Sequence, residues 1–122
     1  MLKRFMKLFH GYELAHGQYR VVKQEADGKM SGRAVTVSEP VTEENFKHHL
    51  NGGDYILGII MLKLDNSCNF GVIDIDIRGE LKLNESLESL EKKIRKTPLI
   101  LCRSKSGGAH LYLFCEPAIA AI

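Results

Sequence analysis

Two aspartates separated by one residue lie inside an apolar segment, FGVIDIDI at residues 70–77. In a β-strand successive side chains point to opposite faces, so Asp74 and Asp76 share one face and the isoleucines share the other, which we expect in a core. Two carboxylates this close repel each other unless a proton or a cation lies between them. Because Mg²⁺ and Mn²⁺ prefer carboxylate oxygen, the strand is predicted to form half of a metal site.

The same alternation also describes an ordinary half-exposed strand, which is the commoner meaning of a lone Asp-x-Asp pattern. Aspartate has a low β-propensity and is seldom found on strand surfaces. Its occurrence twice inside a strongly apolar run favours the metal site.

A small, basic, glycine-rich segment, RSKSGGAH at residues 103–110, leads into the apolar run LYLFC. Glycines allow a tight turn and the close approach of an anion, and successive backbone N–H groups in such a turn can bind one. Hydroxyl, cationic and imidazole side chains beside the turn suit a polyphosphate. The candidate nucleotide-binding residues are Arg103, Ser104, Lys105, Ser106, Gly107, Gly108 and His110. The alternative is a plain hairpin turn with solvated charges and a surface or core histidine.

Together the two segments resemble motifs I and II of the archaeo-eukaryotic primase (AEP) superfamily, the primase-polymerases. Motif I of that family is a hydrophobic strand with Asp-x-Asp, here within residues 70–78. Motif II is a serine-rich turn that ends in a histidine on a strand, here within residues 103–115 and matched by Ser104, Ser106 and His110.

The flanking residues are most similar to the primase-polymerases of CRISPR loci and TOTE-type conflict systems. Those proteins show His-Leu-x-Gly at a helix end, matched by HLNG at residues 49–52, and Asp-x-x-Cys-x-Phe before motif I, matched by DNSCNF at residues 65–70. Motif II is one residue shorter here than in those proteins. The resemblance covers residues 40 to 118.

The resemblance implies a nucleotidyltransferase that synthesises DNA or RNA primers on a template from nucleoside triphosphates. It implies Asp74, Asp76 and His110 as catalytic residues, with Asp74 and Asp76 holding Mg²⁺ or Mn²⁺, while the turn grips the triphosphate. Arg78 would reach a phosphate. Template contacts are suggested only by charge at Arg33, Lys47 and His48, where a solvated surface role is the favoured alternative.

The family also carries a third motif with another acidic residue, whereas no acidic residue follows Glu116 in this sequence. We therefore expect the N-terminal part of a primase-polymerase core, with a further domain or subunit supplying the third acid. One alternative is a catalytically incomplete module that binds nucleotide or nucleic acid. Another is a metal-dependent phosphodiesterase or nuclease, although the glycine-rich turn favours triphosphate binding over cleavage.

Composition agrees with one small domain over residues 1–122. The hydrophobic fraction is 44% and the charged fraction 26%, which is ordinary for a globular protein, and a net charge of +2 is too small to argue for nucleic acid. No apolar run reaches the roughly 18 residues of a membrane span, so no membrane partner is expected. Three cysteines without Cys-x-x-Cys spacing indicate reduced thiols and a cytoplasmic location.

The element order predicts an α+β fold, an antiparallel or mixed sheet with helices on one face that forms part of an RRM-like (ferredoxin-like) primase palm. Strand parity places His110, Tyr112 and Phe114 on one face, on the aspartate side if Leu111 and Leu113 face the helices. Helices are expected over 2–9, over 43–50 after an N-cap at Thr42, and over about a dozen residues after a cap at Asn84. Strands are expected over 17–23, 33–37, 56–64, 70–77, 99–102 and 109–115.

Overall fold

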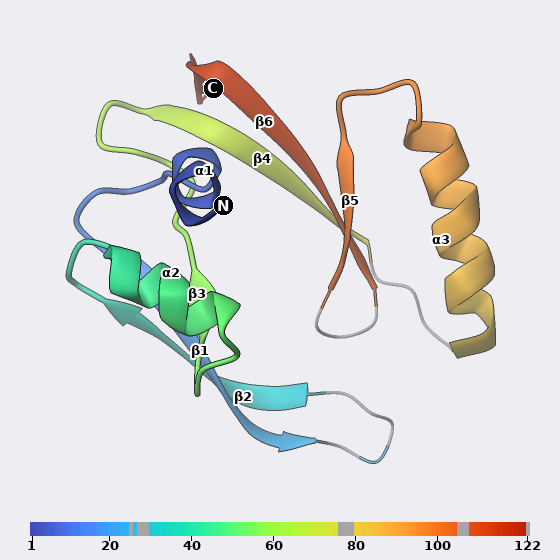
Figure 1. Ribbon diagram of the computed structural model, residues 1–122, viewed down its shortest axis with the longest axis horizontal. Helices are drawn as coiled ribbons and strands as arrows, with labels where there is room; N and C mark the ends of the chain where they lie inside the picture. Colours follow the sequence, from blue (N-terminus) through green and yellow to red (C-terminus); the bar gives the residue numbers. More distant parts are fainter. Residues whose placement is uncertain (25, 27–29, 76–79, 105–107, 122) are drawn as a thin grey trace. The chain divides into compact units, whose positions relative to one another are not determined.

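The computed structural model describes residues 1–24, 26, 30–75, 80–104 and 108–121. The described residues form three helices and two small antiparallel three-stranded sheets, traced in order in Figure 1. They fall into two compact units, which we call the first unit (Met1–Asn69 with Cys115–Ile122) and the second unit (Phe70–Phe114). The α+β class is confirmed. Two sheets form where one was expected, and the RRM-like palm stays a prediction.

The first sheet has the strand order β2-β1-β3 and lies in the first unit. Strand β1 (His16–Gln24) pairs antiparallel with β2 (Met30–Val37) and, along its other edge, with β3 (Ile56–Gly58). The predicted strands at 17–23 and 33–37 are therefore confirmed. Buried His16 places Nδ1 2.9 Å from the carbonyl oxygen of Glu39, which ties the start of β1 to the segment after β2.

Strand β3 is much shorter than the predicted strand over 56–64. Tyr19 pairs with Ile56 and Gly17 with Gly58. Because β1 begins at His16, only one of its residues lies beyond Gly17, too few to pair with residues 59–64. The chain turns instead, with a hydrogen bond from the Lys63 N–H to the carbonyl of Ser67. The prediction of a strand over 56–64 from apolar composition is therefore wrong beyond Gly58.

Two helices of the first unit pack through aromatic rings. Helix α1 (Leu2–Leu8) agrees with the prediction, and helix α2 (Glu43–Leu50) has the predicted bounds and the predicted N-cap. The side chain of Thr42 accepts from the N–H of Asn45, and the Asn45 side chain accepts from the N–H of Thr42, a capping box. Phe46 of α2 is 2% exposed, and its ring meets that of Phe5 edge-on at 6.0 Å.

The second sheet has the strand order β4-β6-β5. Its strands are β4 (Ser67–Ile75), β5 (Ile100–Arg103) and β6 (Ala109–Ala120), and helix α3 (Glu80–Ile94) separates β4 from β5 in the chain. This is the predicted strand-helix-strand-strand order. The last two residues of the predicted motif I strand, 76 and 77, lie outside the described residues.

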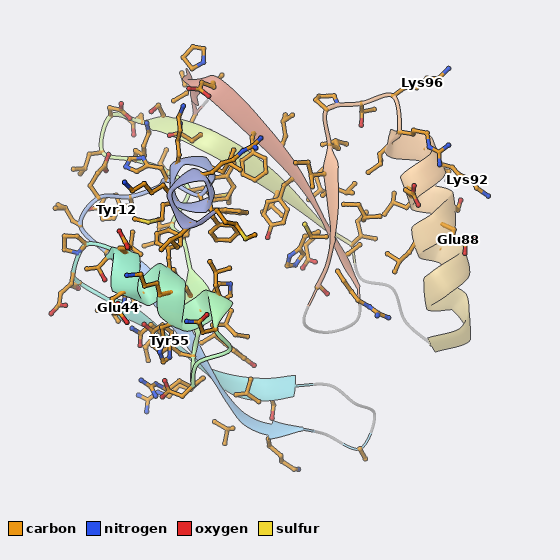
Figure 2. All side chains as sticks on the ribbon, viewed as in Figure 1. Tyr12, Glu44, Tyr55, Glu88, Lys92 and Lys96 are labelled. Carbon is orange, nitrogen blue, oxygen red and sulfur yellow. The ribbon has the colours of Figure 1, made fainter. Side chains whose placement is uncertain are left out.

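Helix α3 begins four residues before the predicted cap, so Asn84 lies inside the helix. The sequence ELKL at residues 80–83 consists of strong helix formers, which extend the helix backwards. The predicted apolar stripe is present, because Leu87, Leu90 and Ile94 are half-buried. Figure 2 shows the exposed charged side chains on and just after α3, with Glu88, Lys92 and Lys96 labelled.

The isoleucine face of motif I is more exposed than predicted. Ile73 is 56% exposed, whereas Phe70, on the aspartate face of the same strand, is 4% exposed. Strand β4 lies at the edge of its sheet, with a neighbouring strand on one side only. Ala109 and Leu111 of β6, the central strand, are buried instead. None of the described helices is long and apolar enough to cross a membrane.

Candidate functional site

Strand β4, which carries Asp74, begins at a turn that is held by polar residues of the segment 65–67. Both the backbone N–H and the hydroxyl of Ser67 donate to Asp65 Oδ1, at 3.0 and 2.6 Å, and these bonds hold the pKa of Asp65 below its ordinary value. Asn66 has a φ of 58°, a left-handed conformation that asparagine tolerates. The Asp-x-x-Cys-x-Phe segment thus acts structurally, turning the chain and ending in the buried Phe70.

Strands β5 and β6, on either side of the motif II turn, pair antiparallel with each other. Arg103 pairs with Ala109, and the Ser104 N–H donates to the carbonyl of Gly108 at 2.9 Å. Ser104 and Gly108 are buried and Ala109 is fully buried, whereas Arg103 is exposed. Residues 105–107, which include the predicted Lys105, Ser106 and Gly107, lie outside the described residues.

The two motifs meet through one carboxylate and one imidazole. Asp74 Oδ1 lies 3.3 Å from His110 Nε2, within the second unit. The Asp74 side chain is 69% exposed and the His110 side chain 33% exposed, so solvent-borne ligands have access to both. The structure therefore places the first residue of Asp-x-Asp beside the last residue of motif II. Asp76 and Arg78 lie outside the described residues.

An aromatic cluster supports this contact. Phe70 of β4 lies 6.3 Å from Tyr112 and 5.9 Å from Phe114, centroid to centroid, and the rings of Tyr112 and Phe114 stack at 5.9 Å. The ring of His110 meets that of Tyr112 edge-on at 5.9 Å. The predicted parity is confirmed: His110, Tyr112 and Phe114 share the face that carries Asp74.

Tyr112 also contacts the second ring nitrogen of His110. Its hydroxyl oxygen lies 3.3 Å from His110 Nδ1. Burial raises the pKa of Tyr112, and the negative charges of ionised Cys102 and Asp74 add to the shift. Strand parity predicts the face of Tyr112 but not this contact, since parity specifies which side chains are neighbours and not which of their atoms form a hydrogen bond.

Among the described residues, Asp74 offers one carboxylate of the type that a hard divalent cation takes as a ligand. No cluster of three or more histidine, cysteine, aspartate or glutamate residues suited to a metal occurs within the described ranges. Mg²⁺ does not need such a cage, because it usually keeps several waters and takes one or two carboxylates together with phosphate oxygens of the substrate. Exposed Asp74 offers this kind of oxygen.

The candidate template residues of the first unit are largely engaged with protein neighbours. Lys47 forms ion pairs with Glu43 and Glu44 of its own helix, and His48 Nε2 lies 2.8 Å from Asp54 Oδ1. Arg33 is exposed on β2, directly opposite Arg20 of β1. Of these three residues, Arg33 has the arrangement best suited to an external anion.

An unpredicted polar cluster surrounds Tyr55, which Figure 2 labels below α2. The ring of His48 stacks on Tyr55 at 4.2 Å, the Arg20 guanidinium lies 5.6 Å from the Tyr55 ring centroid, and Arg20 and His48 both contact Asp54. Desolvation raises the pKa of Asp54, but Arg20 and His48 lower it by more, so its net pKa is below the ordinary value. The cluster joins residues that are distant in the chain, so no local sequence pattern predicts it.

The His-Leu-x-Gly segment ends α2 and connects it to the first sheet. His49 Nδ1 accepts a hydrogen bond from the Leu57 N–H at 3.4 Å, and burial lowers the pKa of His49. Gly52 has a φ of 71°, a conformation that glycine adopts without cost.

A cavity of about 370 Å³ in the first unit has mostly apolar walls, among them Phe9, Tyr12 and Phe46, and contains none of the predicted site residues.

Comparison with known proteins agrees with the two motifs. No curated protein matches the chain significantly. The sequence model for the archaeo-eukaryotic primase domain of TOTE conflict systems matches residues 2–122, nearly the whole chain. It includes both segments that meet at Asp74 and His110. The chain therefore belongs to the TOTE conflict system archaeo-eukaryotic primase domain family.

Proposed function

We propose that this domain, taken as one unit of function over residues 1–122, binds a nucleoside triphosphate with a divalent cation and uses it for template-directed primer synthesis. The observation that carries the proposal is the 3.3 Å contact between Asp74 of motif I and His110 of motif II. This contact brings a carboxylate, which can bind a cation, next to an imidazole, which can donate a hydrogen bond to a phosphate.

Asp74 and Asp76 are the proposed ligands of Mg²⁺ or Mn²⁺. Asp74 is exposed enough to share a hydrated cation, and Asp76 is proposed with it from the Asp-x-Asp spacing of the sequence. When bound, such a cation neutralises phosphate charge and polarises the phosphorus that is attacked. Asp74 thus anchors the cation next to His110.

The motif II turn is proposed to bind the triphosphate. The bond between Ser104 and Gly108 closes the turn, and the burial of both residues indicates that they shape it. Positive charge then comes from Arg103 and Lys105, a hydroxyl from Ser106, and an N–H from His110. Backbone N–H groups around Gly107 would complete an anion site.

A DNA or RNA template and a further domain or subunit with the third acid are the proposed partners for polymerisation. Without that acid the same site would serve a module that binds nucleotide or nucleic acid. Cleavage of phosphodiesters is a further outcome that two-metal chemistry allows. Incubation of a labelled oligonucleotide, annealed to a template, with nucleoside triphosphates and Mg²⁺ separates these cases, because extension lengthens the labelled strand, cleavage shortens it and binding alone leaves its length unchanged.

The proposal is tested by titrating the chain with ATP and dATP in the presence of Mg²⁺ and, separately, of a chelator. We expect cation-dependent binding that weakens about tenfold or more in Asp74→Asn and in His110→Gln, because each removes a hydrogen bond or charge pair to a charged ligand. Asp76→Asn is expected to behave like Asp74→Asn.

Glu88→Gln is the matched control. It removes one exposed carboxylate from α3 in the same unit, and it should leave binding unchanged. Absence of triphosphate binding by the wild-type chain, or binding that ignores the cation, would overturn the proposal.

A further inference from the structure

His110 has a partner on each ring nitrogen. Its Nε2 lies 3.3 Å from Asp74 Oδ1, and its Nδ1 lies 3.3 Å from the hydroxyl oxygen of Tyr112. All three residues belong to the second unit. The imidazole is therefore bracketed by a carboxylate and a phenol, and their chemistry limits where its proton can reside.

A neutral imidazole carries one N–H and one lone pair. A lone pair on Nε2 would face a carboxylate oxygen and be repelled by it, whereas an N–H there is attracted. The Tyr112 phenol keeps its hydrogen at neutral pH, since its pKa is raised above the ordinary value by burial and nearby negative charge. The consistent arrangement has the proton on Nε2, and Nδ1 accepts from the Tyr112 hydroxyl.

Tyr112 is itself held in place by aromatic packing. Its ring stacks on Phe114 with an interplanar angle of 14° and lies 6.3 Å from the buried Phe70. Across the hairpin its backbone pairs with Ile100. These contacts restrict the two side-chain torsions of Tyr112, so the direction of its hydroxyl is set before any ligand binds.

We propose that Tyr112 is a positioning residue of the nucleotide site, whose hydroxyl fixes His110 in the tautomer with the N–H on Nε2, the nitrogen that lies 3.3 Å from Asp74 Oδ1. In this state neither ring nitrogen presents a free lone pair to a metal, and the Nε2–H, which lies beside Asp74, is the donor that would turn to an anionic phosphate oxygen when Asp74 binds the cation. The inference rests on the proposed function and deepens it. Tyr112 acts through His110 and needs no contact of its own with the triphosphate.

The tautomer is tested by nitrogen NMR of the histidine side chains at pH 8, in wild type and in Tyr112→Phe, with His110→Gln identifying the His110 signals. Phenylalanine keeps the ring and removes the hydroxyl. We expect wild-type His110 to be protonated on Nε2 with a hydrogen-bonded Nδ1, and the Nδ1 signal to move toward that of a free acceptor in Tyr112→Phe. Protonation on Nδ1 in the wild type, or an unchanged Nδ1 signal in the variant, would overturn the proposal.

Binding of ATP with Mg²⁺ gives the second readout. Tyr112→Phe should weaken it about 2- to 10-fold, the effect of losing one neutral hydrogen bond that orients the donor. Tyr55→Phe is the matched control, because it loses a hydroxyl contact with Asn45 in the first unit and should bind as the wild type does. Equal affinity of Tyr112→Phe and wild type would refute the positioning role. Absence of binding by the wild-type chain would overturn the proposed function, whereas the nitrogen spectra still decide whether Tyr112 orients His110.

Discussion

The ring of Phe70 lies 5.9 Å from the ring of Phe114, and this pair aligns the two strands that carry the candidate site. Asp74 is four residues forward of Phe70 along β4, and His110 is four residues back from Phe114 along β6, as an antiparallel register requires. The same alignment of β4 and β6 that brings the two rings together therefore brings the carboxylate to the imidazole.

Replacement of Phe70 should affect the stability of the fold, because Phe70 is a buried packing residue and not a residue of the proposed binding chemistry. Phe70 is 4% exposed, so Phe70→Ala is expected to lower the free energy of unfolding by about 3 kcal/mol, the usual cost of such a cavity. Ile73→Ala on the same strand is the control and should cost less than about 1 kcal/mol, because Ile73 is 56% exposed. Urea unfolding of both variants measures the difference, and equal costs would contradict the assigned facing of β4.

The capping box of α2 gives a local prediction. Thr42→Ala removes the acceptor for the Asn45 N–H and should lower the free energy of unfolding by about 1 kcal/mol. Ser38→Ala, at an exposed position before the helix, should change it by less than about 0.5 kcal/mol. Thermal unfolding of the two variants checks this, and a Thr42→Ala protein as stable as Ser38→Ala would show that the cap contributes little.

His49 predicts a pH dependence of stability. Burial lowers its pKa in the folded chain, so at acidic pH the unfolded chain binds more protons at this residue than the folded chain does. The contribution of His49 is thus fully present above its unfolded pKa of about 6.5 and is lost as the pH falls through that value toward the lower folded pKa.

The variant His49→Asn isolates this effect, because an amide oxygen can accept from the Leu57 N–H but does not titrate in this range. Denaturant unfolding between pH 5 and pH 8 should show a shallower loss of stability on acidification in His49→Asn than in wild type. His10→Asn, at an exposed position, is the control and should retain the wild-type slope. Identical slopes for all three proteins would remove His49 as the cause.

Local sequence signals predicted the elements whose ends are set by local chemistry. The bounds of α2 follow from Thr42 at its start and the Asn51-Gly52 stop, and both act within a few residues of the chain. The β5–β6 hairpin follows from a glycine-rich turn between two apolar runs. Membership of the primase family followed from the spacing of motif residues, which the family match confirms.

The predictions that were wrong, and the contact that was missed, concern properties set by distant partners. The apolar run at 56–64 becomes only a three-residue strand because β1, its antiparallel partner, begins at His16 and offers only one residue beyond the pair of Gly17 with Gly58. The exposure of Ile73 depends on what packs against its face of the sheet, which alternation along the strand does not specify. The Tyr112 hydroxyl contact with His110 depends on rotamers that Phe70 and Phe114 restrict, and strand parity carries no information about rotamers.

A double-mutant cycle on the affinity for ATP with Mg²⁺ tests most directly whether Asp74 and His110 form one site. The four proteins are wild type, Asp74→Asn, His110→Gln and the double variant. Because the two side chains are 3.3 Å apart, the account predicts that the double variant loses less affinity than the two single losses together, with a coupling of about 0.5–3 kcal/mol. Losses that add within about 0.3 kcal/mol would contradict a shared site for the two motifs.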